Sequence, residues 1–205
     1  MKTDFITAFE GAQRVPSSKL DLFIKRNFLS PAECAEIVAM IDARRRPSTI
    51  ADDVTGDPLF RTSETCDLDP DNPLTSAIDR RIADFLGQGI VFGEQMQGQR
   101  YAPGQEFKLH TDYFEPSGAD YQTHCAVSGQ RTWTAMIYLN EPEAGGATRF
   151  KVIDKIIQPE TGKMLCWNNQ LPGGFPNPAT LHQGMKVRKG TKYVITKWFR
   201  ERPWS

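Results

Sequence analysis

Several features of secreted, membrane-bound and thiolate-metal proteins are missing from this sequence of 205 residues. Its first residues, MKTDFITAFEGAQRV, lack the apolar core of a signal peptide. No stretch approaches the roughly 20 apolar residues of a membrane span. The four cysteines include no CxxC pair, which argues against a zinc site and against a disulfide framework. We therefore expect a protein of the reducing cytoplasm with no membrane partner.

An excess of charge of one sign is also missing. Lysine plus arginine and aspartate plus glutamate both count 25, so the formal net charge is zero and a nucleic-acid partner is not indicated. The length suits one domain with a substantial core, and we expect residues 1–205 to form a single unit. Charge balance and length do not indicate an oligomeric state.

Two helices are indicated in the first half of the chain. Ser30 and Glu33 have the spacing of a capping box, with proline at the first helical position, and an apolar stripe follows. These signals predict a helix over Pro31–Arg45. A second apolar stripe of helical period begins at Pro73 and ends before Gly87, which predicts a second helix.

From Glu94 onward, short β-branched and aromatic segments alternate with glycine and proline turns. The clearest strand is 132–140, in which alternation places Ile137 on one face and Tyr138 on the other. Lys192 shares one face of a second strand with Val194, Thr196 and Trp198. About eight antiparallel strands after helices predict an α+β, mainly β fold. We expect a double-stranded β-helix (jelly-roll) core over 94–205, with residues 1–93 supplying first strands and helices on one outer face.

The segment Phe114–Gln130 has mixed polarity and no sustained period, so we expect a long loop. It follows the strand that carries His110 and Asp112, which favours a lid over a disordered insertion. His124, inside this segment, is interpreted as a solvated loop histidine and receives no role.

His110 and Asp112 are two residues apart, and a strand's period of two points both side chains to one side. An HxD pair alone is as often a surface pair. His182, however, begins the pattern His-x-Gly-x-x-Val-x-x-Gly-x-Lys that ends at Lys192. Two histidines and a carboxylate form the facial triad of non-haem Fe(II) oxygenases. A bidentate 2-oxo acid and O2 would fill its open positions, and Lys192 would pair with the acid's far carboxylate.

Four ordered blocks make the resemblance to a family specific. They read RYAPGQEFKLHTDYF, GQRTWTAMIYLNEPEAGGATRF, PETGKMLCWNN and LHQGMKVRKGTKYVITKWFRERPW, and FLSPAEC and RTSETC precede them. In order and spacing the sequence resembles the prolyl 4-hydroxylase type of Fe(II)- and 2-oxoglutarate-dependent dioxygenases. The resemblance covers nearly the whole chain.

The resemblance implies roles for individual residues. It implies iron ligation by His110, Asp112 and His182, and a salt bridge from Lys192 to 2-oxoglutarate. The other implied cosubstrate residues are Tyr101, Tyr138, Thr134, Met136 and Thr196, and the implied primary-substrate residues are Arg61, Arg131 and Trp198. Other interpretations of these residues stay open: strand or core aromatics, core packing of the methionine, a surface arginine, and an arginine paired with an acid such as Glu94.

The implied reaction is hydroxylation of a C–H bond, most simply in a prolyl residue of a peptide or protein, with release of succinate and CO2. Ascorbate would rescue oxidised iron. The sequence departs from the common family pattern at Phe107, Thr111 and Ala147. A free amino acid or another small molecule therefore remains an alternative substrate. A further alternative is a non-catalytic binder of metal or 2-oxoglutarate, or a cupin-like zinc protein. Such a protein would not need the three metal ligands and Lys192 together, which argues against this alternative.

Overall fold

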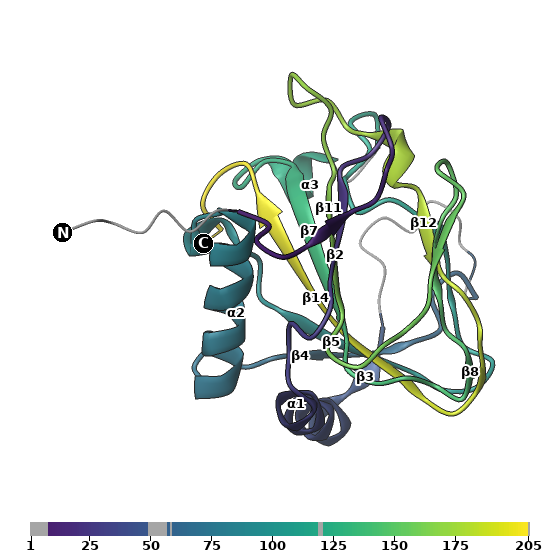
Figure 1. The fold of residues 1–205 in the computed structure, drawn as a ribbon. Coiled ribbons are helices and arrows are strands. Elements are labelled where there is room, and N and C mark those ends of the chain that lie inside the picture. The colour runs from purple at the N-terminus through teal and green to yellow at the C-terminus, as the bar shows by residue number, and fades with distance from the viewer. Residues whose placement is uncertain (1–7, 49–56, 58, 119–120, 205) are drawn as a thin grey trace.

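The computed structural model describes residues 8–48, 57, 59–118 and 121–204, and its ribbon is shown in Figure 1. The helices are α1 (Pro31–Arg44), α2 (Pro73–Leu86) and α3 (Tyr121–Cys125), with 3-10 turns η1 (Ile90–Phe92) and η2 (Pro178–Thr180). The strands are β1 (Gln13–Arg14), β2 (Leu22–Lys25), β3 (Arg46–Pro47), β4 (Glu64–Asp67), β5 (Gln97–Tyr101), β6 (Phe107–His110), β7 (Arg131–Tyr138), β8 (Ala144–Gly145), β9 (Thr148–Phe150), β10 (Lys155–Ile157), β11 (Met164–Asn168), β12 (His182–Gly184), β13 (Val187–Lys189) and β14 (Lys192–Arg200). Within these residues, no helix combines the length and apolarity needed to cross a membrane.

The strands form two main sheets. The large sheet has the order β1-β2-β11-β7-β14-β5-β4-β3, and the small one has the order β10-β9-β12-β6. A short pair, β13-β8, lies at one end. Figure 1 shows α2 on one side of the large sheet and β12 of the small sheet on the other. This arrangement confirms the predicted mainly β jelly roll with helices on one outer face.

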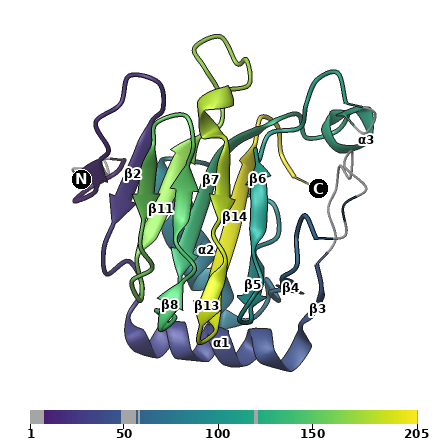
Figure 2. The same cartoon turned by 90° about the vertical axis from the view of Figure 1, so that its right-hand side faces the viewer.

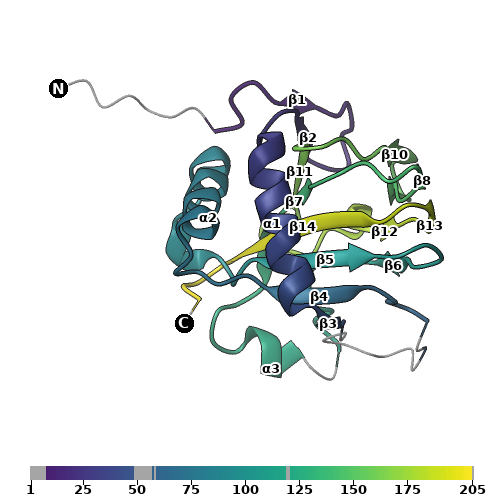
Figure 3. The same cartoon turned by 90° about the horizontal axis from the view of Figure 1, so that it is seen from below.

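The two predicted helices are present because their end signals are satisfied. Ser30 and Glu33 exchange the hydrogen bonds of a capping box, and α1 ends at Arg44, one residue earlier than predicted. Gly87 ends α2 in the left-handed conformation, with φ of 64°, where its N–H donates to carbonyls of the last turn. Figure 3 shows α1 crossing in front of the strands with α2 beside it, and both helices contribute buried residues to one cluster with the large sheet.

Alternation along β7 and β14 divides the apolar core into two parts. Ile137 and Ile195 belong to the part that packs under α1 and α2, together with Ile37 and Ile78 of those helices. The intervening residues point into the jelly roll, where Met136, Tyr138 and Val194 join a second buried cluster. The predicted facing of these strands is confirmed.

The second half of the chain contains more elements than its pattern indicated. Among the described residues after Glu94 there are ten strands, β5 to β14, rather than about eight, because several are only two or three residues long. The segment Phe114–Gln130 also includes a one-turn helix, α3, where only loop was expected. Figure 2 shows α3 and the loop after β11 at one end of the strands, with α1 at the opposite end.

Candidate active site

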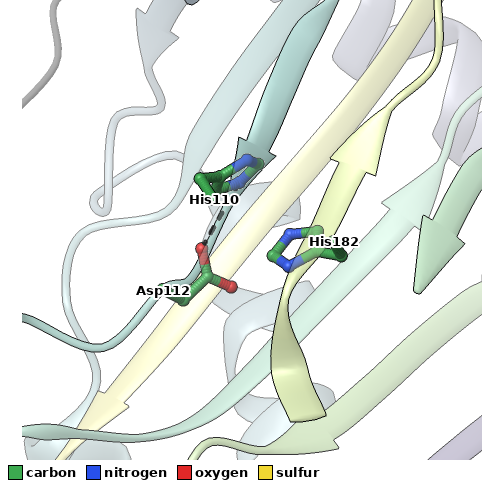
Figure 4. A group of neighbouring side chains, drawn as sticks. All are labelled: His110, Asp112 and His182. Atoms are coloured by element: carbon green, nitrogen blue, oxygen red, sulfur yellow. Dashed lines mark ion pairs between the residues drawn. The ribbon is translucent and has the colours of Figure 1, made fainter. Parts of the chain in front are cut away.

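Three side chains of the jelly-roll interior offer metal ligands to one point. Antiparallel pairing of β6 with β12 sets His182 directly opposite His110, and Asp112 follows two residues after the end of β6. One ligand atom from each residue lies within 4.8 Å of the other two. Figure 4 shows the imidazoles and the carboxylate facing a common centre. The structure thus brings together all three residues that the sequence proposed as metal ligands.

Backbone carbonyls select the nitrogen that each histidine turns to the centre. Nδ1 of His110 lies 2.7 Å from the carbonyl oxygen of Lys108, and Nδ1 of His182 lies 2.8 Å from that of Thr180. A nitrogen that donates to a carbonyl carries the proton, so Nε2 of each ring keeps its lone pair for a metal. Burial lowers the pKa of His110 to about 3, and the nearby His182 adds to this effect.

The carboxylate is oriented by a buried hydroxyl. Thr134 Oγ1 donates to Asp112 Oδ2 over 2.7 Å and itself accepts a hydrogen bond of 2.9 Å from Asn169 Nδ2. Burial would raise the pKa of Asp112, but the two imidazoles and Arg131 outweigh it and hold the pKa below its usual range. Thr134 was expected to line the cosubstrate pocket. It lies outside the cavity lining and supports a metal ligand instead.

Aromatic rings pack around the imidazoles. Phe107 stacks on His110 with ring centroids 3.5 Å apart, and Trp167 meets His182 edge-on at 4.9 Å. The ring centroid of Phe150 lies 5.5 Å from that of His182. Although Phe107 departs from the common family pattern, its ring still packs against His110, the first of the three ligands. Trp167 and Phe150 were missed, although the alternation of their strands marks them as inward-facing.

A cavity extends from the triad to Lys192, at the start of β14. Lys192 is 2% exposed, and its Nζ lies 5.1 Å and 5.4 Å from the ring centroids of Tyr101 and Tyr138. Burial lowers the pKa of Lys192 to about 7, and among the described residues no carboxylate forms an ion pair with it. A buried ammonium without an acidic partner suits the carboxylate of a ligand.

The other expected cosubstrate residues surround this cavity in different ways. Tyr101, Met136 and Thr196 line it directly, and Thr196 Oγ1 donates to Gln99 Oε1 over 3.0 Å. The Tyr138 hydroxyl instead donates to Thr148 Oγ1 over 2.6 Å. Gln99 and Thr148 also line the cavity and were missed, because single polar residues within short strands carry no distinctive sequence signal.

Of the three expected substrate residues, Arg61 and Trp198 line the cavity, and Arg131 does not. Arg131 makes a bidentate ion pair with Glu94, at 2.7 Å and 2.8 Å, as the acid-paired interpretation expected. Its guanidinium also lies 4.0 Å above the Trp198 ring, and Nη1 donates to the Asp112 carbonyl oxygen at 3.3 Å. Arg131 therefore supports the cavity wall from behind.

The expected lid is anchored at its base. Gln130 donates to the carbonyl of Phe114 and accepts from its N–H, so its side chain ties the two ends of the segment together. His124 stacks on the Phe114 ring, with centroids 4.7 Å apart, rather than standing in solvent. Residues 119–120 lie outside the described residues, and opening of this segment stays a prediction.

Comparisons with known proteins agree with this geometry. A family model described as the 2OG-Fe(II) oxygenase superfamily matches residues 96–200. Prolyl 4-hydroxylase 1 of Arabidopsis thaliana is 32% identical over 204 residues, covering 90% of this chain and 70% of that protein. Human prolyl 4-hydroxylase subunit alpha-1 is 29% identical over 180 residues, and the match spans 86% of this chain but only 34% of that protein.

Solved structures resemble the whole fold. A viral collagen prolyl hydroxylase from Paramecium bursaria Chlorella virus-1, solved as a 2OG complex, superposes with a TM-score of 0.67 at 26% identity and covers 87% of this chain and 94% of that one. A Pseudomonas putida prolyl-4-hydroxylase shares the fold, with a TM-score of 0.62 at 18% identity, covering 88% and 92% of the two chains. The matched family model, the aligned relatives and the triad with its buried lysine lead to one conclusion: the chain belongs to the 2OG-Fe(II) oxygenase superfamily, within its prolyl 4-hydroxylase group.

Proposed function

We propose that this chain is a 2-oxoglutarate-dependent dioxygenase that hydroxylates a prolyl residue of a peptide or protein, with release of succinate and CO2. The observation that carries the proposal is the placement of the His110, Asp112 and His182 donors and the acid-free Lys192 in one cavity. A binder of metal alone would not need a buried ammonium beyond the ligand set. Two imidazoles and one carboxylate fit Fe(II), and they leave positions for 2-oxoglutarate and O2.

The chain's own residues would bind and orient the metal and 2-oxoglutarate, and they would exclude water from the site. His110, Asp112 and His182 would hold Fe(II), and Lys192 would pair with the far carboxylate of 2-oxoglutarate. Thr196 and Gln99 would border that cosubstrate, while Phe107 keeps the first imidazole shielded. Bound iron, 2-oxoglutarate and O2 supply the oxidising power for the C–H bond, and the protein supplies their placement.

The rim of the cavity supports a substrate with a carbonyl group. Trp198 lines the cavity, and its Nε1 is buried without a hydrogen-bond partner among the described residues. An unpaired buried donor is costly unless a ligand satisfies it, and a peptide carbonyl is a suitable acceptor. Arg61 also lines the cavity, with its guanidinium over the Phe107 ring. The similarity to proteins named as prolyl hydroxylases favours a proline-containing peptide over a small molecule.

A substrate screen tests the proposal. Purified protein with Fe(II), 2-oxoglutarate and ascorbate would be offered proline-containing peptides, matched peptides with alanine in place of proline, and free amino acids. We expect succinate release to rise only with the proline peptides, and mass spectrometry to place one added oxygen on the proline. Turnover with free amino acids alone would replace the peptide substrate with a small molecule, and His182→Ala provides the inactive control.

Two further properties belong to this proposal. Ascorbate would reduce iron oxidised in turnovers without substrate, so omitting it should shorten the period of linear succinate release. The chain would work in a reducing compartment such as the cytoplasm, a proposal supported by four free and buried cysteines: Cys34, Cys66, Cys125 and Cys166. Alkylation of denatured protein from cells, without added reductant, should modify all four.

A further inference from the structure

Two arginines of the C-terminal segment hold the end of α3. Arg200 Nη2 donates to the carbonyl oxygen of His124. Arg202 donates to the next three carbonyl oxygens, those of Cys125 and Ala126 at 3.0 Å each and that of Val127 at 2.7 Å. Carbonyl groups at a helix C-terminus lack intrahelical partners, so cations are favourable there. Both arginines thus have the same relation to α3.

Arg200, unlike Arg202, also forms an ion pair with Glu94. Its Nε lies 3.2 Å from Glu94 Oε1, the same oxygen that receives Arg131 Nε at 2.7 Å. The side chains of Arg200 and Glu94 are 2% and 10% exposed. One buried carboxylate therefore serves two buried guanidinium groups. Both guanidinium groups also lie over the Phe114 ring, at 4.8 Å for Arg131 and 5.0 Å for Arg200.

The same contacts continue to the cavity. Arg131 lies 4.0 Å above the ring of Trp198, which lines the cavity, and it donates to the carbonyl of the metal ligand Asp112. Arg200, which does not line the cavity, pairs with the Glu94 carboxylate through charge rather than through a hydrogen bond. Without the Arg200 side chain, the Glu94 carboxylate and the Arg131 guanidinium would gain rotational freedom. The ring of Trp198 would then no longer have a fixed cation behind it.

We propose that Arg200 is a positioning residue for the primary substrate: through Glu94 it fixes Arg131 behind Trp198 and so sets the shape of the cavity rim. Arg202, which contacts α3 but not Glu94, has no such role. None of the described residues of 113–118 and 121–130 lines the cavity, so holding α3 in place does not by itself shape the rim. The assignment rests on the proposed function for its substrate, and on the contacts of Arg200 for its mechanism.

The test compares Arg200→Gln with Arg202→Gln, using the proline peptide that gives the highest succinate release. We expect Arg200→Gln to raise the KM for the peptide about tenfold, a factor within the coupling range of contacting charged residues. The KM for 2-oxoglutarate and the affinity for Fe(II) should remain within twofold, because Arg200 contacts neither Lys192 nor a metal-binding atom. Arg202→Gln should leave all three values within twofold. Hydrogen exchange should increase over 121–128 in both variants.

Three results would overturn the assignment. An equal rise in peptide KM for both variants would mean that the position of α3 is what matters. An unchanged peptide KM in Arg200→Gln would mean that the ion pair with Glu94 has no effect on the rim. A parallel loss of Fe(II) or 2-oxoglutarate binding would indicate general disruption. If Arg200→Gln does not fold, Arg200→Lys keeps the charge but lacks the two-pronged geometry, and the same comparison applies.

A second measurement needs no substrate and separates this inference from the proposed function. In a background with Trp133→Phe and Trp204→Phe, only Trp167 and Trp198 remain. Quenching of tryptophan fluorescence by acrylamide then reports mainly on Trp198, which is 9% exposed, because Trp167 is 1% exposed. Arg200→Gln should increase the quenching, and Arg202→Gln should not. Increased quenching with no peptide turned over by the wild type would support the positioning role and reject the prolyl substrate. Identical quenching in the two variants would reject the positioning role, whatever the substrate.

Discussion

The two faces of the large sheet differ in what they bury. Under α1 and α2 the sheet presents Ile137 and Ile195, each at most 1% exposed, to an apolar layer. On the opposite face the same two strands present Met136 and Lys192 to the cavity. Alternation along a strand lets one backbone serve both surfaces. The comparison teaches that stability and chemistry reside on opposite sides of the same strands and should be separable by substitution.

The largest expected effect concerns the metal ligands of the interior face. His182→Ala removes one of three donors, so Fe(II) affinity should fall by more than about 100-fold, since even outer partners of metal ligands contribute about 10–100-fold. Anaerobic titration with Fe(II) would measure this loss. Ile195→Ala, on the helix-covered face, should retain wild-type affinity. Weak binding in both variants would remove the distinction between the faces.

The next effect concerns the cosubstrate. Lys192→Ala would leave the far carboxylate of 2-oxoglutarate buried without a cation, a loss of about 3–5 kcal/mol. At about 1.4 kcal/mol per tenfold change, affinity for 2-oxoglutarate should fall by roughly 100-fold or more. Fe(II) binding should change little. Calorimetry that found wild-type affinity for 2-oxoglutarate would withdraw the role of Lys192 while leaving the triad intact.

A substitution on the helix-covered face should lower stability and leave ligand affinity unchanged. Ile137 is fully buried, so Ile137→Ala should lower the free energy of unfolding by about 2–5 kcal/mol, because apolar burial is reduced and a cavity remains. Urea unfolding would measure the change. Below the unfolding transition, affinities for Fe(II) and 2-oxoglutarate should match the wild type. A large loss of affinity in the folded variant would show that the two faces are coupled.

The smallest expected effect is a dependence on pH. Burial disfavours the charged ammonium and lowers the pKa of Lys192 to about 7, and only the protonated form pairs with a carboxylate. Affinity for 2-oxoglutarate should therefore be highest below pH 7 and fall by up to about tenfold per pH unit above it. Lys192→Arg should flatten this part of the profile, because arginine stays protonated. A slope that persists in Lys192→Arg would assign the titration to another group.

The sequence predicts best where the signal is local. Capping residues and helical period located α1 and α2 to within a residue or two of their ends, and period two identified the facing of β7 and β14. It predicts less well where function depends on contacts between distant strands. Thr134 was assigned to the cosubstrate and instead supports Asp112, because only the folded sheets bring that hydroxyl to the carboxylate.

The sequence by itself determined the chemistry that is available: a triad at His110, Asp112 and His182, and a lysine at the start of the last strand. Residue type and short-range spacing carry that information, because ligand chemistry and strand period are local properties. Only the tertiary structure decided the partners, such as the carboxylate of Glu94 between Arg131 and Arg200. Such contacts join residues far apart along the chain, and they depend on how the sheets and the C-terminal segment pack.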